Sequence, residues 1–185
     1  FEGVGGGNDL TIDSSGNVGF GITPDTWSSE HVALQIGLTG AVWSSLSGGI
    51  DSTYIGNNVY NNSGWKAITT GEASKIQLKD NTIWFQNAPS VSADATLTFT
   101  DQMCILADGN VGIGTTSPSS YYAKDLVVSA ADEGGITMVS SGANQQQYLM
   151  FADGTSGAER FRGYIGYDHN GDLLQVTSGG SLKFL

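Results

Sequence analysis

Two stretches of the sequence repeat a glycine-spaced phrase of the kind that can hold a phosphate group. They read "SGNVGFGITP" at residues 15–24 and "DGNVGIGTTSP" at residues 108–118. A glycine-rich loop binds phosphate when it leads into a helix whose first N–H groups point at the anion. Neither copy has the G-x-G-x-x-G spacing, and no helical pattern follows either one. The sequence therefore argues against a nucleotide site.

The glycines of both phrases follow the period of two that is typical of a β-strand. Gly19 and Gly21 alternate with apolar residues in the first copy, as Gly112 and Gly114 do in the second. Successive side chains of a strand point to opposite faces, so the glycines of each copy share one face. Glycine weakens a strand and often marks the close approach of another backbone. We expect these four glycines to face neighbouring chains at a symmetry axis.

Other groups that could bind a metal or do chemistry are scattered. His31 and His169 have no ligand-spaced partners, which leaves zinc without support. Asp168, Asn170 and Asp172 in "DHNGD" resemble the start of a calcium loop, but the glycine and glutamate of an EF-hand do not follow. The Asn-Gly pair is also a strong hairpin signal. A plain turn is the favoured interpretation there, with calcium as the alternative.

Catalytic patterns are absent from the sequence. It contains no G-x-S-x-G phrase, and a single His near serines does not make a triad. A glycosidase needs only two carboxylates, but nothing in the spacing of the 18 acidic residues selects a pair. We expect no catalytic residues and no cofactor.

Aromatic and amide side chains between residues 43 and 65 are the remaining candidates for a binding site. Aromatic rings can stack on sugar rings while amides bind hydroxyl groups. For any single ring, the favoured interpretation is structural, with the ring stapling a thin β-module. Tyr60 and Trp65 lie in the most polar stretch and are expected to be exposed. The candidate ligand-binding residues are Trp43, Tyr54, Asn57, Asn58, Tyr60, Asn61, Asn62 and Trp65.

Composition limits the class of protein. The 185 residues include 27 glycines and 39% hydrophobic residues, but only 14% are charged. The net charge of −11 argues against binding to nucleic acid or to an anionic membrane surface. No apolar run is long enough for a transmembrane helix. Cys104, the single cysteine, lies in an apolar run and is expected to be a buried, unreactive thiol.

Short apolar runs separated by turn signals predict an all-β chain built of hairpins. Two such hairpins are expected in residues 74–86 and 163–176. The repeated phrase divides the chain into a β-module at residues 9–107 and a shorter one at residues 108–185, truncated at its C-terminus. Residues 1–8 are expected to end a preceding segment. We therefore expect the chain to be part of a longer polypeptide.

Several phrases together resemble bacteriophage tail-fibre and tailspike proteins. These are "DGNVGIGTTSP" followed by "DLVVS", and "STYIGNNVYNNSGWKAI" leading through "GEASKIQL" and "IWFQNAP" to "MCILADGNVGIG". In particular they resemble fibre regions upstream of an endosialidase-type intramolecular chaperone domain. The resemblance covers most of the chain, but it transfers no binding residue.

The resemblance implies an elongated, intertwined homotrimer in a virion tail fibre, outside the cell. Its partners would be two identical chains, other virion proteins, and a polysaccharide or outer-membrane receptor on the host. The expected function is non-catalytic host attachment, as a shaft or receptor-binding region. Two alternatives remain open: a tailspike-type polysaccharide depolymerase, and a purely structural spacer or capsid-attached fibre.

Overall fold

The computed structural model describes residues 10–46, 51–179 and 181–184, with no description of the side chains of 182–184. Its regular elements are strands and two short 3₁₀ helices, η1 (Pro118–Ser120) and η2 (Gly157–Phe161). The all-β class is therefore confirmed. The expected end of a preceding segment at residues 1–8 lies outside the described residues.

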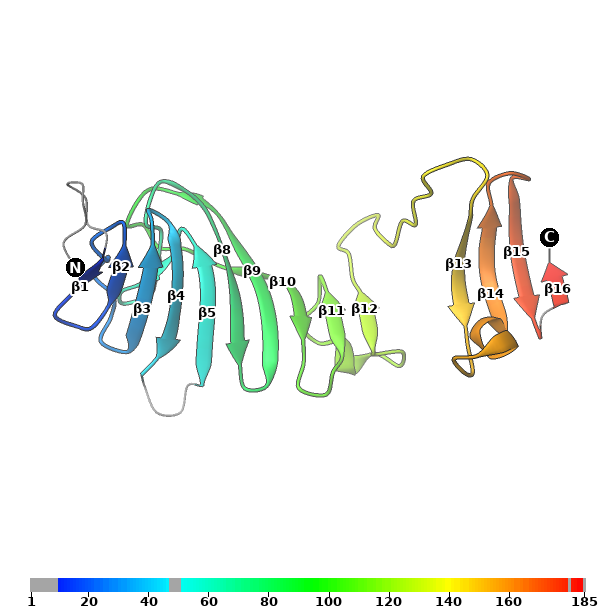
Figure 1. The fold of residues 1–185 in the computed structure, drawn as a ribbon, viewed down its shortest axis with the longest axis horizontal. Coiled ribbons are helices and arrows are strands. Elements are labelled where there is room, and N and C mark those ends of the chain that lie inside the picture. The colour runs from blue at the N-terminus through cyan, green and yellow to red at the C-terminus, as the bar shows by residue number, and fades with distance from the viewer. Residues whose placement is uncertain (1–9, 47–50, 180, 185) are drawn as a thin grey trace. The chain divides into compact units, whose positions relative to one another are not determined.

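The chain divides into two compact units, residues 1–135 and 136–185. The first unit is built on one ten-stranded sheet, shown in Figure 1. Its neighbouring strands are antiparallel except for the pairs β2–β3 and β11–β12, which are parallel. In spatial order its strands are β1 (Thr11–Ile12), β2 (Val18–Phe20), β3 (His31–Ile36), β4 (Gly40–Ser45), β5 (Ser52–Asn57), β8 (Gly71–Lys79), β9 (Thr82–Val91), β10 (Thr100–Ile105), β11 (Val111–Ile113) and β12 (Leu126–Val128).

The second unit is a four-stranded antiparallel sheet. Its strands follow chain order: β13 (Gln146–Phe151), β14 (Gly163–Asp168), β15 (Leu173–Ser178) and β16 (Ser181–Phe184). The expected module boundary, between residues 107 and 108, lies in the turn between β10 and β11, which are neighbours in the ten-stranded sheet. There the Gly109 N–H donates to the Leu106 carbonyl, and pairing continues across the turn. The repeat thus marks a hairpin inside one sheet, because both of its strands keep their neighbours.

The two copies of the repeated phrase build the same local structure. In each copy a turn with a left-handed glycine, Gly16 or Gly109, precedes the strand. The buried asparagine after that glycine, Asn17 or Asn110, is held by a carboxylate. Asn17 Nδ2 donates to Asp13 at 2.8 Å, and Asn110 Nδ2 donates to Asp108 at 2.7 Å. The shared Gly-Asn pair therefore encodes a repeated turn, although the carboxylate comes from four residues before the asparagine in the first copy and from two residues before it in the second.

The close approach expected at the glycines is present, but the chain's own backbone makes it. A Cβ on Gly19 would lie 2.2 Å from the Ile22 carbonyl oxygen, and one on Gly112 would lie 2.4 Å from that of Thr115. Gly21 and Gly114 have φ values of +71° and +70°, which favour glycine in any case. All four glycines are thus explained within one chain, and they supply no argument for a symmetry axis.

Both expected hairpins are present. Asp80 and Asn81 join β8 to β9 with positive φ at both positions, as a two-residue type I′ turn requires. The "DHNGD" turn joins β14 to β15, and the Asn170 N–H donates to Asp168 Oδ1 at 2.9 Å. Short polar turns of this kind can be predicted because their dihedral angles demand particular residues.

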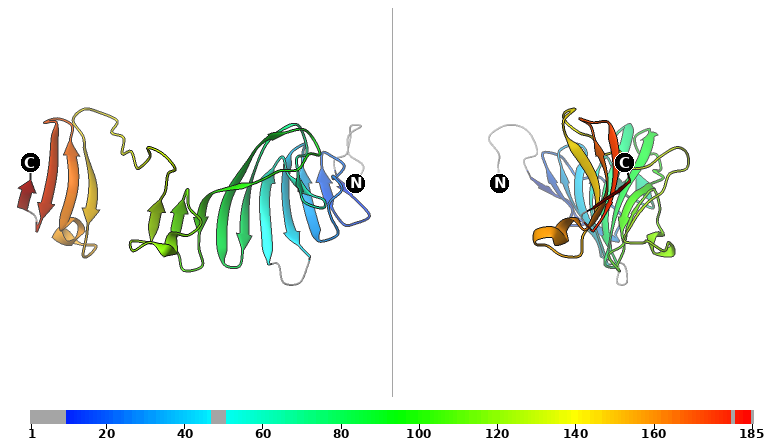
Figure 2. Two further views of the ribbon diagram at one scale, coloured as in Figure 1. Left: turned by 180° about the vertical axis from the view of Figure 1, so that it is seen from behind. Right: turned by 90° about the vertical axis from the view of Figure 1, so that its right-hand side faces the viewer.

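The ten-stranded sheet has two unlike faces. Residues 58–70 and 91–99, here called the covering segments, lie over the inner face, where Val59, Ala67 and Leu97 join the buried core. They include the short pair β6 (Tyr60–Asn61) and β7 (Trp65–Lys66), and they bond to each other through Leu97 N–H and the Trp65 carbonyl. Figure 2 shows the sheet from behind. The outer face has no such cover among the described residues.

The glycine geometry predicts that Gly112→Ala destabilises the chain by about 1–3 kcal/mol, because the new methyl group overlaps the Thr115 carbonyl. Urea unfolding followed by tryptophan fluorescence measures the loss. Gly135→Ala is the matched control, since a Cβ there meets no atom within 4 Å. Equal stability of the two variants would contradict the close contact.

Candidate functional site

The candidate aromatic residues come together, but as the core of the first unit. Trp43 and Tyr54 lie opposite each other on β4 and β5 and stack with ring centroids 5.0 Å apart. Trp65 meets the edge of the Tyr54 ring at 5.2 Å, and Trp27 lies 5.2 Å from Trp43. The structural interpretation of these rings is therefore confirmed, since stacked and edge-on pairs of this kind stabilise a core.

The expected exposure of Tyr60 is wrong. Only 6% of its surface is accessible, and its hydroxyl donates to Asp94 Oδ1 at 2.8 Å. Burial and this neighbouring carboxylate raise the pKa of Tyr60 to about 12. Trp65 is half-buried against the core. Polar neighbours in sequence did not indicate exposure, because the covering segments fold their rings inward and turn their polar groups to each other.

The candidate asparagines have different roles. Asn58 is buried with a φ of +56°. Its Nδ2 donates to the carbonyls of Thr69 and Glu72, and its Oδ1 accepts from the Thr69 N–H and hydroxyl. The amide thereby holds the first covering segment in place and has no capacity left for a ligand.

The other three asparagines are more accessible than Asn58. Asn61 is half-buried, and its Oδ1 accepts from the Ser28 hydroxyl at 3.3 Å. The Asn62 N–H donates to the Gly64 carbonyl within the β6–β7 turn. Asn57 is exposed and lies on the outer face of the sheet. The eight candidates therefore do not form one open site.

Lys75 is a buried cation that the sequence reasoning missed. Its Nζ lies 4.5 Å from the Phe99 ring centroid, 4.9 Å from that of Trp65 and 5.4 Å from that of Tyr54. The ammonium also donates to Gln86, whose Nε2 donates to Asp101. Aromatic faces attract such a cation, yet burial lowers the pKa of Lys75 to about 8. Only the tertiary structure, which brings Trp65 and Phe99 of the covering segments over Lys75 on β8, reveals this cage.

The outer face carries one apolar residue from every strand of the ten-stranded sheet, directly opposite one another. We call this line the apolar row. Nine steps of about 4.8 Å between strands make it about 43 Å long. Four of its residues are clearly exposed, with accessible fractions between 37% and 65%. In spatial order the row is Ile12, Val18, Leu34, Val42, Ile55, Ile76, Phe85, Met103, Ile113 and Val128.

The lines of side chains on either side of the apolar row are also uncharged. One side is mainly apolar, and the other carries Phe20 and Ile36 at one end and small or polar residues along the rest. The first line is Val32, Ser44, Thr53, Leu78, Ile83, Ile105, Val111 and Leu126; the second is Phe20, Ile36, Gly40, Asn57, Ser74, Asn87 and Thr100. Monomeric proteins rarely expose a continuous apolar patch of this extent, so it indicates an interaction surface.

The second unit repeats this feature on a smaller scale. Leu149, Ile165 and Val176 lie opposite one another on β13, β14 and β15, and Phe151 and Leu174 share their face. Leu149 and Phe151 are each more than half exposed. Among the described residues of this unit, no hydrophobic side chain is buried. A domain is ordinarily built from at least two packed layers, and the described residues of this unit supply one sheet.

Groups that bind metals are not assembled in the described part of the chain. No cluster of three or more His, Cys, Asp or Glu side chains could hold a metal ion there. At the proposed calcium position, Asp168 accepts from Asn170 and Gln146, and Asp172 accepts from the Tyr167 hydroxyl. The described residues form no helix that could span a membrane.

Cys104 is buried, as expected. Its Sγ lies 3.5 Å from the Thr115 carbonyl oxygen, to which the thiol donates. Burial raises the pKa of this thiol, which keeps it protonated and unreactive at neutral pH.

No protein-family model matches the chain, and no curated protein sequence matches it.

The hydrogen bonds of the Asn58 amide predict that replacing Asn58 lowers the free energy of unfolding more than replacing the adjacent Asn57. Asn58→Ala should lower the free energy of unfolding by about 2–4 kcal/mol, because it removes four hydrogen bonds of a buried amide and leaves part-buried groups of Thr69 and Glu72 without their partner. Asn57→Ala, at the exposed neighbour, should change it by less than about 0.5 kcal/mol. Chemical denaturation compares the two variants. A similar loss in both would refute the role assigned to Asn58.

Lys75 predicts a dependence of stability on pH. Its pKa is about 8 in the folded chain against 10.5 for the unperturbed group. Between these values the unfolded state binds more protons, so the free energy of unfolding rises with pH by at most about 1.4 kcal/mol per unit. Below pH 8 Lys75 no longer contributes to the pH dependence of the free energy of unfolding. Lys75→Met keeps the length of the side chain but removes the titrating group.

Denaturation of the wild type and of Lys75→Met from pH 7 to pH 10.5 separates this group from all others. The stability of the wild type should rise relative to that of the variant above pH 8. A difference that stays constant across this range would show that the pKa of Lys75 is not lowered.

Proposed function

We propose that this chain is a non-catalytic segment of a homotrimeric virion fibre that attaches to a host-cell surface. The observation that carries the proposal is the uncharged outer face with its apolar row. Burying a fully exposed isoleucine side chain contributes about 1.5–3 kcal/mol, so the half-exposed Ile55 would contribute part of that on association. The other exposed residues of the row, Ile12, Ile113 and Val128, would add similar partial contributions.

The most suitable partner for the outer face is another copy of the chain. The chain carries a net charge of −11, so two copies that met through their charged surfaces would repel each other. The three lines of side chains on the outer face contain no charged residue. The apolar row is continuous, with one residue for each strand. A copy related by rotation about an axis parallel to the row would meet it with matching spacing.

The second unit supports the same proposal. Its row of Leu149, Ile165 and Val176, of which the first two are exposed, offers another apolar face, and the unit has no buried hydrophobic core among its described residues. Association would supply the missing second layer, since a domain is ordinarily built from at least two packed layers. Three copies, rather than two, follow from the resemblance to tail fibres, as do the virion location and attachment to the host.

Charged substitutions in the apolar row test the assembly. Ile55→Lys combined with Ile76→Lys should abolish the trimer, because desolvating unpaired ammonium groups at the interface is unfavourable. Size-exclusion chromatography with light scattering should give three times the 19.3 kDa chain mass for the wild type. Thr98→Lys adds a charge at an exposed position of a covering segment and should leave the trimer intact. A monomeric wild type would refute the proposal.

The same preparations distinguish the proposed role from its alternatives. Labelled wild-type trimer should bind susceptible host cells and release no reducing sugar from their polysaccharide. Sugar release would indicate a depolymerase. A trimer that binds no host cells and no surface fraction of them would be a structural spacer.

A further inference from the structure

Three polar side chains lie side by side across neighbouring strands on the inner face of the first unit. Lys75 on β8 lies directly opposite Gln86 on β9, and Gln86 lies directly opposite Asp101 on β10. We call these three residues the Lys–Gln–Asp row. Directly opposite residues have Cβ atoms about 5 Å apart, so their side chains can meet end to end. The row aligns an amine, a carboxamide and a carboxylate in that order.

The Gln86 carboxamide bonds to a different neighbour at each end. Its Oε1 accepts a hydrogen bond from Lys75 Nζ, and its Nε2 donates to Asp101 Oδ1 at 2.5 Å. A nitrogen that can act as a nucleophile therefore lies at the carbonyl side of the amide, and a proton acceptor lies beside the amide nitrogen. Asp101 also interacts electrostatically with the Lys75 ammonium. Transfer of an acyl group from an amide to an amine needs these groups in these places.

The surroundings of Lys75 favour its uncharged, nucleophilic form. Only 5% of the residue is accessible, and the rings of Tyr54, Trp65 and Phe99 surround Nζ. With a pKa of about 8, about a tenth of the amines are neutral at pH 7, against about one in 3,000 for an unperturbed lysine. Desolvated lysines of this kind act as nucleophiles in proteins.

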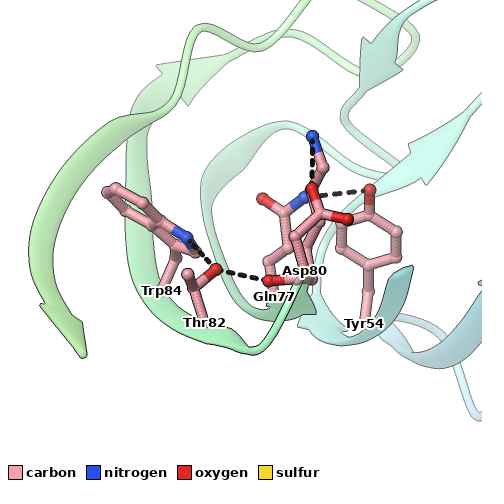
Figure 3. A network of polar contacts seen from close by, with 6 residues as sticks. Tyr54, Gln77, Asp80, Thr82 and Trp84 are labelled. Atoms are coloured by element: carbon pink, nitrogen blue, oxygen red, sulfur yellow. Dashed lines mark hydrogen bonds and ion pairs between the residues drawn. The ribbon is translucent and has the colours of Figure 1, made fainter. Parts of the chain in front are cut away.

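Other polar residues of the same hairpin lack this arrangement. Gln77 Nε2 donates to the Tyr54 hydroxyl at 3.2 Å, so its amide has a tyrosine where Gln86 has a carboxylate (Figure 3). Lys79 Nζ lies 3.5 Å from Asp80 Oδ2, and both of these side chains are largely exposed. Gln77 and Asp80 therefore provide matched controls for the Lys–Gln–Asp row.

We propose that the Lys–Gln–Asp row forms an intramolecular isopeptide bond between Lys75 and Gln86. The neutral amine attacks Gln86 Cδ, the Nζ–Cδ bond forms, the Cδ–Nε2 bond breaks, and one ammonia leaves. One proton passes from Nζ to the departing nitrogen through the Asp101 carboxylate, which is unchanged at the end. The step consumes no oxidant, reductant or co-reactant. Gln86 and Asp101 are half-buried, so the released ammonia has a way out.

The bond lies within one chain and on the inner face, so it does not depend on the proposed assembly. It would join β8 to β9 covalently under the covering segments, and it would limit the freedom of the unfolded chain as a disulfide does. A linked chain has no ammonium at residue 75. The pH dependence predicted for Lys75 therefore belongs to the unlinked chain, and the mass of a preparation identifies which form it contains.

Intact-mass spectrometry of the full chain, folded at about pH 8 and then denatured, tests the bond. The wild type should be lighter than its sequence mass by one ammonia, about 17 Da. Digestion with trypsin should give residues 67–79 and 80–124 as one linked peptide, because trypsin does not cleave after an acylated lysine. Lys75→Met, Gln86→Met and Asp101→Asn should each keep their full sequence mass.

Two variants outside the row serve as controls. Gln77→Met and Asp80→Asn should lose one ammonia, as the wild type does. Tryptophan fluorescence shows whether each variant folds, because the Trp65 ring lies over residue 75. Asp101→Asn keeps the size of its side chain, so it tests the reaction even where Lys75→Met fails to fold.

The contrary outcomes are distinct. A folded wild type with its full sequence mass would overturn the inference and leave Lys75 a structural cation. A loss of ammonia that persists in Lys75→Met would come from cyclisation at an Asn-Gly pair such as Asn170–Gly171 and would also overturn it. So would a loss of water, about 18 Da, with the link at Asp101, because the carboxylate would then be the acyl donor. A monomeric wild type that has lost ammonia would support the bond and refute the trimer.

Discussion

A single-layer β-sheet has two faces to cover, and the described residues of the first unit cover only one face of the ten-stranded sheet. Residues on alternate positions of each strand point to opposite sides, so the pairing register decides which side chains meet. On the inner side the chain folds its own covering segments over Trp43, Tyr54 and the small residues around them. On the outer side ten strands align one apolar residue each. The other features of the first unit follow from this asymmetry.

The covered inner face accounts for the burial of aromatic side chains between residues 43 and 65, although polar residues surround them in the sequence. The covering segments bring rings from Trp65 and Phe99 over the sheet, and their polar backbone groups are satisfied by each other and by Asn58. Lys75 sits among these rings because cation–π contacts and Gln86 partly offset the loss of hydration. Where the cover ends, the same face turns polar at Gln77 and Lys79, and a tryptophan remains partly exposed.

The repeated glycine phrase has a local cause. Its glycines allow the chain after each short strand to fold back over that strand, so that Gly19 and Gly112 lie under their own following residues. The strand then runs antiparallel to the one before it and parallel to the one after it in both copies. Alternation of glycine with apolar residues does not by itself distinguish such a fold-back from a contact between chains. The apolar row, and not the glycines, is the feature on which the proposed association rests.

The sequence alone determined the features that depend on near neighbours. The all-β class, the Asp80–Asn81 turn, the "DHNGD" turn and the burial of Cys104 follow from residues a few positions apart, because dihedral preferences and alternation act locally. Only the tertiary structure decided the exposure of Tyr60, the cage around Lys75, the extent of the sheet across residue 108 and the composition of the two faces. These depend on the register between strands distant in sequence, and a shift of one residue would exchange the faces.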